Sequence, residues 1–430
     1  MIGVSMNILH AGRAAVVLLC MASYSWGAPL SLQECLQKAR NSNPALKSAV
    51  WDSHIAQEGS RQTKAAVYPR IDAQAGYTLQ PSAQAVKLGG MTAETQEPNY
   101  PFAGIAATYT IYDFGRRDAR IQQSDANTGA ASESFLFSTG EVALQVIAAY
   151  FGILEADRLI QAAAEEVAQI TEHRRMAQVL FEEGVVTRND VLQADVRLAS
   201  ARQKKLAVTN RRENGWLLLN FLTGSEATFR GELDEAANFA PPAPLTAAGS
   251  TLPEKRHDIK AQKQVLAARD FEVREHRENY LPEIYTRLGM DYVQNDKVRE
   301  QAVYSATLGI RVNLFDGFAS DAAHEKAVKQ RSKQQEALRL TEQRALLEIA
   351  TARNDVQVAN ERIATSEAAI IQSEENLRIN KERYQERVGI ASEVLDAQTL
   401  VTQTKTDYYR ALYDYQTAAA RLQNALGELN

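Results

Sequence analysis

The chain has 430 residues, with 53 acidic and 48 basic side chains and a formal net charge of −5 at pH 7. This balance argues against a nucleic-acid partner, which would require a basic face. Only Cys35 remains once the first 27 residues are set aside, so we expect no internal disulfide and a small, buried, apolar cysteine.

Residues 1–27 have the pattern of a secretory signal peptide. Arg13 precedes the apolar stretch AAVVLLCMA, and small residues surround an expected cleavage site near Gly27. The stretch is too short to span a bilayer as a helix. We therefore expect an exported protein, and no transmembrane helix in the rest of the chain.

The remainder is a tandem duplication. Pro69 and Pro282 are 213 residues apart, whereas Asp113 and Asp316 are 203 apart. The difference must lie in one connection, the turn-rich residues 80–101, because loops tolerate changes of length and helices do not. Each repeat is predicted as helix, strand, variable loop, strand, very long helix, break and returning helix.

The boundaries follow from the repeat and from the prolines. No proline lies between Pro101 and Pro241, so the long segments can be uninterrupted helices. Repeat one is predicted at 28–240, with a β-hairpin at 68–115 and a break at 181–190; repeat two at 241–430, with a β-hairpin at 281–316 and a break at 384–393. A proline-rich link, residues 240–253, joins the repeats.

The long segments carry a seam of residues spaced alternately by three and four, which is the heptad a/d spacing. In repeat two the seam is Ile349, Ala352, Val356, Ala359, Ile363, Ser366, Ile370, Ser373, Leu377, Asn380 and Tyr384. The corresponding seam of repeat one starts at Val146 and ends at Arg174, Ala177 and Phe181. Such a helix is roughly 100 Å long, and on the helices alone an ordinary coiled coil remains possible.

Four segments alternate apolar and polar residues, beginning near Ile71, Ile105, Ile284 and Leu308. Charge is confined to one face and aromatic residues cluster at the ends, which is typical of transmembrane barrels. A soluble sandwich edge explains any one strand, but four are harder to dismiss. A sheet in hydrocarbon must close and four strands are too few, so we expect oligomers; three copies would supply twelve strands.

With these elements in place, three segments make the chain resemble the TolC-like outer-membrane efflux family. They are LFEEGVVTRNDVLQAD (180–195), RYQERVGIASEVLDAQ (383–398) and YYRALYDYQTAAARLQNALGEL (408–429). The resemblance implies a mainly α fold with membrane β structure: a homotrimer whose 12-stranded outer-membrane β-barrel, four strands per chain, continues into a long periplasmic α-helical barrel of coiled-coil hairpins. It also implies a channel for efflux or type I secretion.

That channel would export substrates from the periplasm or an inner-membrane pump to the exterior. The implied partners are a periplasmic adaptor protein, an inner-membrane pump and outer-membrane lipid, with no cofactor in the channel. The two breaks become helix-hairpin tips at the periplasmic end, where the gate lies. Glu393 and Asp396 match the family's pore constriction, and threefold symmetry would make two rings of three carboxylates.

The gate contacts also follow from the resemblance. Asp190 and Tyr384 match contacts that hold family members closed, and we expect Asp190 to accept a hydrogen bond from Tyr384. Asn189 and its counterpart Ser392 are expected to be N-caps of the returning helices. Arg387 stands where glycine is usual. A carboxylate near a helix start is also stabilised by the helix dipole, a purely structural role open to Asp190 and to Glu393.

Gly389 occupies the position where the family's gate arginine can sit, so that arginine is missing here. An enzyme is not expected, because no phosphate-binding loop or nucleophile elbow occurs, and HEKAV at His324 lacks the second histidine of a zinc helix. The scattered histidines predict no metal site. The alternative function is a periplasmic coiled-coil adaptor or structural protein of an export system, which would not need amphipathic strands.

Overall fold

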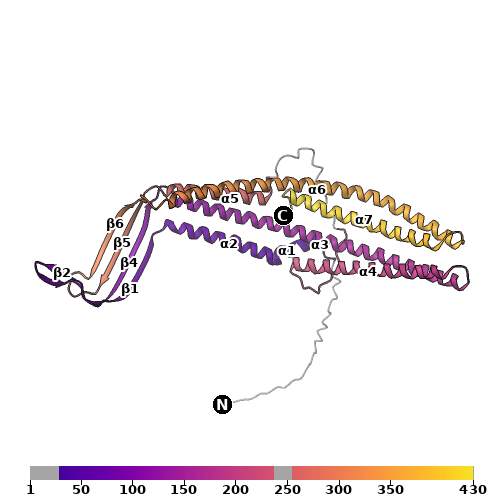
Figure 1. Ribbon diagram of the computed structural model, residues 1–430, viewed down its shortest axis with the longest axis horizontal. Helices are drawn as coiled ribbons and strands as arrows, with labels where there is room; N and C mark the ends of the chain where they lie inside the picture. The colour runs from indigo at the N-terminus through magenta and orange to yellow at the C-terminus, as the bar shows by residue number, and fades with distance from the viewer. Residues whose placement is uncertain (1–28, 237–253, 430) are drawn as a thin grey trace, which may run out of the picture.

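The computed structural model describes residues 29–236 and 254–429. The expected signal peptide and the whole proline-rich link, residues 240–253, lie outside these residues. The described chain is elongated: a sheet lies at one end, and paired helices run from it to two tips at the other end (Figure 1).

The helices and strands of the first half are α1 (Leu32–Ser42), α2 (Pro44–Lys64), η1 (Ala65–Val67), β1 (Arg70–Leu79), β2 (Ala85–Leu88), β3 (Met91–Glu94), β4 (Asn99–Tyr112), α3 (Arg116–Glu182) and α4 (Arg188–Thr223). Those of the second half are α5 (His257–Glu278), β5 (Glu283–Val293), β6 (Ala302–Arg311), α6 (Ala319–Gln385) and α7 (Ala391–Ala425). The small β2–β3 hairpin lies in the connection whose length differs between the repeats.

The sheet is antiparallel with strand order β1-β4-β5-β6, so the two repeats join through β4 and β5. Its apolar face carries Ile71, Ile105, Leu288 and Leu308, all of them exposed. The opposite face carries polar side chains such as Gln74 and Asp291, which flank Gly104. The outer strands β1 and β6 each pair on one side only among the described residues.

The two long helices α3 and α6 each have 67 residues, which confirms the predicted long helical segments. In α6 every predicted seam position is buried or half-buried. In α3 the seam holds as far as Ile170 and again at Ala177, which is fully buried. Arg174 and Phe181 are exposed, and His173, Met176 and Leu180 turn inward instead. That part of the prediction was wrong, because a 3.6-residue helix drifts relative to a heptad pattern unless it supercoils to compensate.

In each repeat a buried side chain before one helix forms a hydrogen bond with the end of the returning helix. Asn43 precedes α2, and its Nδ2 donates to the carbonyl of Leu222 near the end of α4 at 2.9 Å. Arg256 precedes α5, and its guanidinium donates to the carbonyl of Ala425 at the end of α7 at 3.2 Å. Asn43 and Arg256 are 213 residues apart and the two carbonyls 203, so the contacts are equivalent under the repeat.

The main core lies where α1, α3, α4 and α7 meet, about halfway along the molecule, and contains Tyr150, Phe151 and Trp216. Cys35 is fully buried here, as expected, and burial raises the pKa of its thiol to about 11. Contrary to expectation, one 18-residue window of α3 has the length and hydropathy of a membrane span, but half of that window is buried inside the chain.

Candidate functional site

The two tips end their long helices with the same backbone turn. Gly184 in the first tip has φ of 74°, and Arg387 at the equivalent position of the second has φ of 62°. The following N–H donates to the carbonyl five residues back in each tip, at 2.8 and 2.9 Å. This Schellman turn places its left-handed residue where glycine is preferred, so Arg387 holds a strained backbone.

The returning helices begin earlier than predicted. Their N-caps are Thr187 and Ile390, whereas Asn189 and Ser392 are the second residues of α4 and α7. The expected capping role of Asn189 and Ser392 was therefore wrong, because the chain enters the helix almost directly after the Schellman turn. Asp190, the third residue of α4, accepts hydrogen bonds through Oδ2 from the backbone N–H of Thr187 at 2.9 Å and from its hydroxyl at 3.0 Å.

Tyr384 is buried between the hairpins, with 7% of the residue exposed. Its ring lies 5.2 Å from the ring of His173, and its hydroxyl has no hydrogen-bond partner. Burial, and secondarily the charge of Asp190, raise the pKa of Tyr384, so the two groups are near each other. The expected hydrogen bond between them is nevertheless absent from this structure.

The two predicted pore acids each lie beside an arginine. Oε2 of Glu393 is 3.2 Å from the guanidinium of Arg383 across the second tip. Oδ1 of Asp396 accepts a hydrogen bond of 2.8 Å from Arg197. Because Arg197 belongs to α4 and Asp396 to α7, this pair links the two hairpins. Neither arginine was predicted. Arg197 and Asp396 lie 199 positions apart, and no sequence spacing relates residues at that separation.

A cavity of about 240 Å³ lies just behind the tips, between α3, α6 and α7. Its walls include His173, Lys381, Tyr384 and Gln398. Nε2 of His173 and Oε1 of the buried Gln398 have no hydrogen-bond partner, like the Tyr384 hydroxyl. The seam prediction placed Tyr384 on the packed face of α6 but did not predict the cavity, whose polar groups come from α3, α6 and α7.

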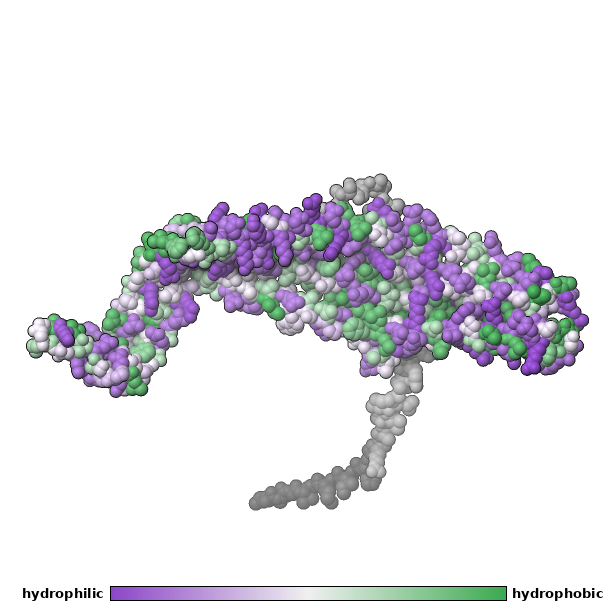
Figure 2. All heavy atoms as spheres, in the orientation of Figure 1, coloured by the Kyte–Doolittle hydropathy of each residue, from purple (hydrophilic) through white to green (hydrophobic). Residues whose placement is uncertain are grey.

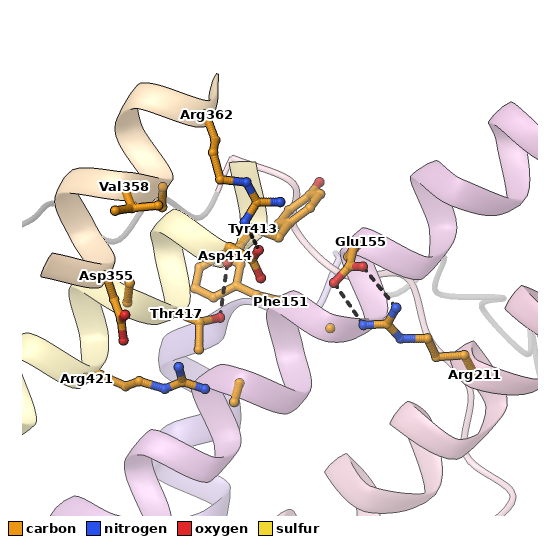
Figure 3. Close-up of a pocket in the computed structure, with 14 residues that line it drawn as sticks. Phe151, Glu155, Arg211, Asp355, Val358, Arg362, Tyr413, Asp414, Thr417 and Arg421 are labelled. Carbon is orange, nitrogen blue, oxygen red and sulfur yellow. Dashed lines mark hydrogen bonds and ion pairs between the residues drawn. The ribbon is translucent and has the colours of Figure 1, made fainter. Parts of the chain in front are cut away.

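A second pocket, of about 400 Å³, lies near the middle of the long helices and is lined by α3, α4, α6 and α7. Figure 3 shows two ion pairs in it, Glu155 with Arg211 at 3.1 Å and Arg362 with Asp414 at 3.0 Å. Burial raises the pKa of Glu155, while the charge of Arg211 opposes that shift. Because each of these charges is paired, we interpret the pocket as a structural contact between the hairpins.

Metal chemistry finds no support in the part of the chain that the structure describes. No group of three or more His, Cys, Asp or Glu side chains there could hold a metal ion.

The sequence pattern described as outer membrane efflux protein matches residues 35–225 and 249–428 of this chain. AprF of Pseudomonas aeruginosa, an alkaline protease secretion protein, is 21% identical over 411 residues, covering 93% of this chain and 85% of AprF. The outer membrane protein TolC of Vibrio cholerae is 21% identical over 422 residues, covering 93% of this chain and 91% of TolC.

Two solved structures share the fold. The outer membrane protein VceC of Vibrio cholerae gives a TM-score of 0.80 at 18% identity, covering 92% of this chain and 96% of VceC. The CmeC outer membrane channel of Campylobacter jejuni gives a TM-score of 0.82 at 17% identity, covering 92% of this chain and 85% of CmeC. The predicted combination of long helical hairpins with a few β-strands is confirmed.

Proposed function

Because the chain belongs to the outer membrane efflux protein family, we propose that three copies form one export conduit, with a barrel at the sheet end and a gate at the helical tips. The protein is an outer-membrane export channel and not an enzyme. Its assembly, gate and partners form the proposal.

The observation that carries the assembly is the incomplete sheet. Within hydrocarbon every backbone polar group needs a partner, so the free edges of β1 and β6 must be paired. Pairing β6 of one copy with β1 of the next closes a ring, and three copies give twelve strands. The exposed aromatics Tyr68, Phe315 and Phe318 lie where the sheet meets the helices, and Figure 2 shows apolar side chains gathered there. Such a belt suits a membrane–water interface.

The helical part supports a tunnel between copies. Large apolar side chains remain exposed on the single chain, among them Val196 and Leu206 of α4 and Leu347 and Ile371 of α6. Burial of these side chains against neighbouring copies would stabilise the assembly through the hydrophobic effect. The long helices then become the wall of a conduit that extends away from the membrane.

The gate is assigned to the tips, which lie at the opposite end of the molecule from the sheet (Figure 1). In this proposal Glu393 and Asp396 form the constriction. The gate contacts at the hairpin tips come from four further residues: Asp190, Tyr384, Asn189 and Arg387.

The remaining partners are a periplasmic adaptor, which would dock near the tips, and an inner-membrane pump. AprF and BepC of Brucella suis are named for secretion and for efflux respectively, so both classes of cargo are open to this chain.

The assembly is tested with a matched pair of substitutions on β6. Leu308 lies on the apolar face and Thr307 beside it on the polar face. Leu308→Arg places a charge in lipid, which costs about 2–4 kcal/mol near the bilayer midplane, whereas Thr307→Arg faces the barrel interior. We expect wild type and Thr307→Arg to be extracted from outer membranes as trimers by mass measurement in detergent, and Leu308→Arg to be depleted. A stable wild-type monomer, or equal assembly of the two variants, would contradict the proposal.

A further inference from the structure

The cavity behind the tips brings together polar groups that find no partners in the surrounding helices. Tyr384 and Gln398 are 7% and 4% exposed, and an oxygen of each lacks a hydrogen bond. The third unpartnered group is Nε2 of His173. The centroid of the His173 ring lies 5.2 Å from that of the Tyr384 ring. Because α3 belongs to the first hairpin and α6 and α7 to the second, the imidazole of His173 lies at the contact between the two hairpins.

The charged groups around His173 come from each of the helices near it. On α3, the neighbouring Glu172 is exposed and paired with Arg175 at 2.6 Å. On α4, the charge of Asp190 favours the protonated imidazole; on α6, the charge of Lys381 disfavours it. On α7, Gln398 is neutral, and the acid nearest the tip, Glu393, is paired with Arg383. Burial is the largest influence and, with Lys381, lowers the pKa of His173.

We propose that His173 is a proton-operated latch between the two hairpins, neutral when they pack around the cavity and protonated when they separate. In the packed arrangement a charged imidazole would be desolvated beside the ammonium of Lys381, whose Nζ is held 3.2 Å from Oε1 of Gln169. Separation of α3 from α6 would expose the ring to water and let it bind a proton.

The sign of the pH dependence follows from linkage. The pKa of His173 is lowered in the packed arrangement and returns towards its ordinary value of about 6.5 when the ring is exposed. The packed tip therefore has its full stability above about pH 6.5, the ordinary pKa of the exposed ring, and loses stability as the pH falls through and below 6.5. Acidification opens the tip. This inference rests on the proposed gate and adds the signal to which the gate responds.

The test measures tip separation and conductance in the assembled trimer between pH 7.5 and 5.5. A spin label on Glu386→Cys, an exposed residue of the second tip, reports distances between the three copies by pulsed electron spin resonance. Cys35 is fully buried, so the label attaches at position 386. We expect the fraction of separated tips to rise by at least about threefold in wild type on acidification, and to stay within about 1.5-fold in His173→Gln.

Two further variants keep the test independent of how well His173→Gln packs. Lys381→Gln retains the imidazole but removes the charge that opposes its protonation in the packed tip. The pKa of His173 then differs less between the packed and separated arrangements, so the acid-driven rise in separated tips should be smaller than in wild type. His54→Gln changes an exposed histidine of α2 and should keep the wild-type response. A wild-type response in His173→Gln, or a rise in separated tips in Lys381→Gln as large as or larger than in wild type, would overturn the latch. Failure of the channel itself would appear separately, as loss of trimers or of conductance at pH 7.5.

Discussion

Tyr384→Phe separates two accounts of how the tip is held. The substitution keeps the ring that packs against His173 and removes only the hydroxyl, which is buried without a partner in this structure. Leaving a buried polar group unsatisfied costs about 1–3 kcal/mol. Its removal should therefore stabilise the packed tip by about 1 kcal/mol, which is roughly a fivefold fall in the equilibrium constant for local opening.

If the hydroxyl instead donates to Asp190, Tyr384→Phe should destabilise the packed tip, because a hydrogen bond to a charged group is worth about 1.5–3 kcal/mol and would be lost. Hydrogen exchange of peptides covering residues 376–398, measured on the trimer, distinguishes the two. We expect slower exchange there in Tyr384→Phe, and single-channel conductance no higher than in wild type.

Asp190→Ala is the control for this experiment. It removes the carboxylate that accepts two hydrogen bonds from Thr187, so we expect faster exchange at the start of α4. Faster exchange and higher conductance in Tyr384→Phe would refute the reasoning, and would mean that the hydroxyl reaches Asp190 in the assembled channel.

Three other substitutions test the tips and the repeat. Arg197→Ala should leave tip stability almost unchanged, because an exposed ion pair is worth about 0.2–1 kcal/mol, but it should raise cation preference in planar bilayers by freeing Asp396. Asp396→Ala should lower that preference. Unchanged selectivity in both variants would mean that this acid faces away from the pore. Arg387→Gly should slow exchange at the second tip by relieving about 1–2 kcal/mol of left-handed strain, while Gly184→Ala should speed exchange at the first; shifts in the same direction would contradict this. Asn43→Ala should cost about 2–4 kcal/mol, because a helix cap is lost and a buried carbonyl loses its donor, and an unchanged thermal midpoint would disprove that role.

The sequence by itself determined the long helices, the four strands of the sheet and their order, although not the small β2–β3 hairpin or the division of the first helix into α1 and α2. Their hydrophobic periods differ, near 3.5 in the seam of α6 and 2 in the strands, and each period is compatible with one kind of backbone. The duplication added a second constraint, because Asp113 and Asp316 had to occupy equivalent turns. The long helices could be predicted because no proline interrupts them and the seam continues over many turns.

The tips were less predictable, for local reasons. The N-caps of the returning helices are Thr187 and Ile390, which follow each Schellman turn almost directly. Residue type alone does not indicate where such a turn ends, so it could not identify the N-cap. In the last turns of α3, the inward face shifted from Arg174 to His173. The heptad pattern of the sequence does not predict such a rotation of the helix, because the rotation depends on which neighbouring helices the segment contacts.

Only the tertiary structure decided which groups from separate hairpins meet. Arg197 and Asp396 pair across 199 residues, and His173, Tyr384 and Gln398 come from three helices to line one cavity. Sequence spacing specifies neighbours within a helix, because the backbone geometry of a helix is fixed. Contacts between helices depend on crossing angle and axial shift, which arise from the packing of whole surfaces and leave no short-range signal in the sequence.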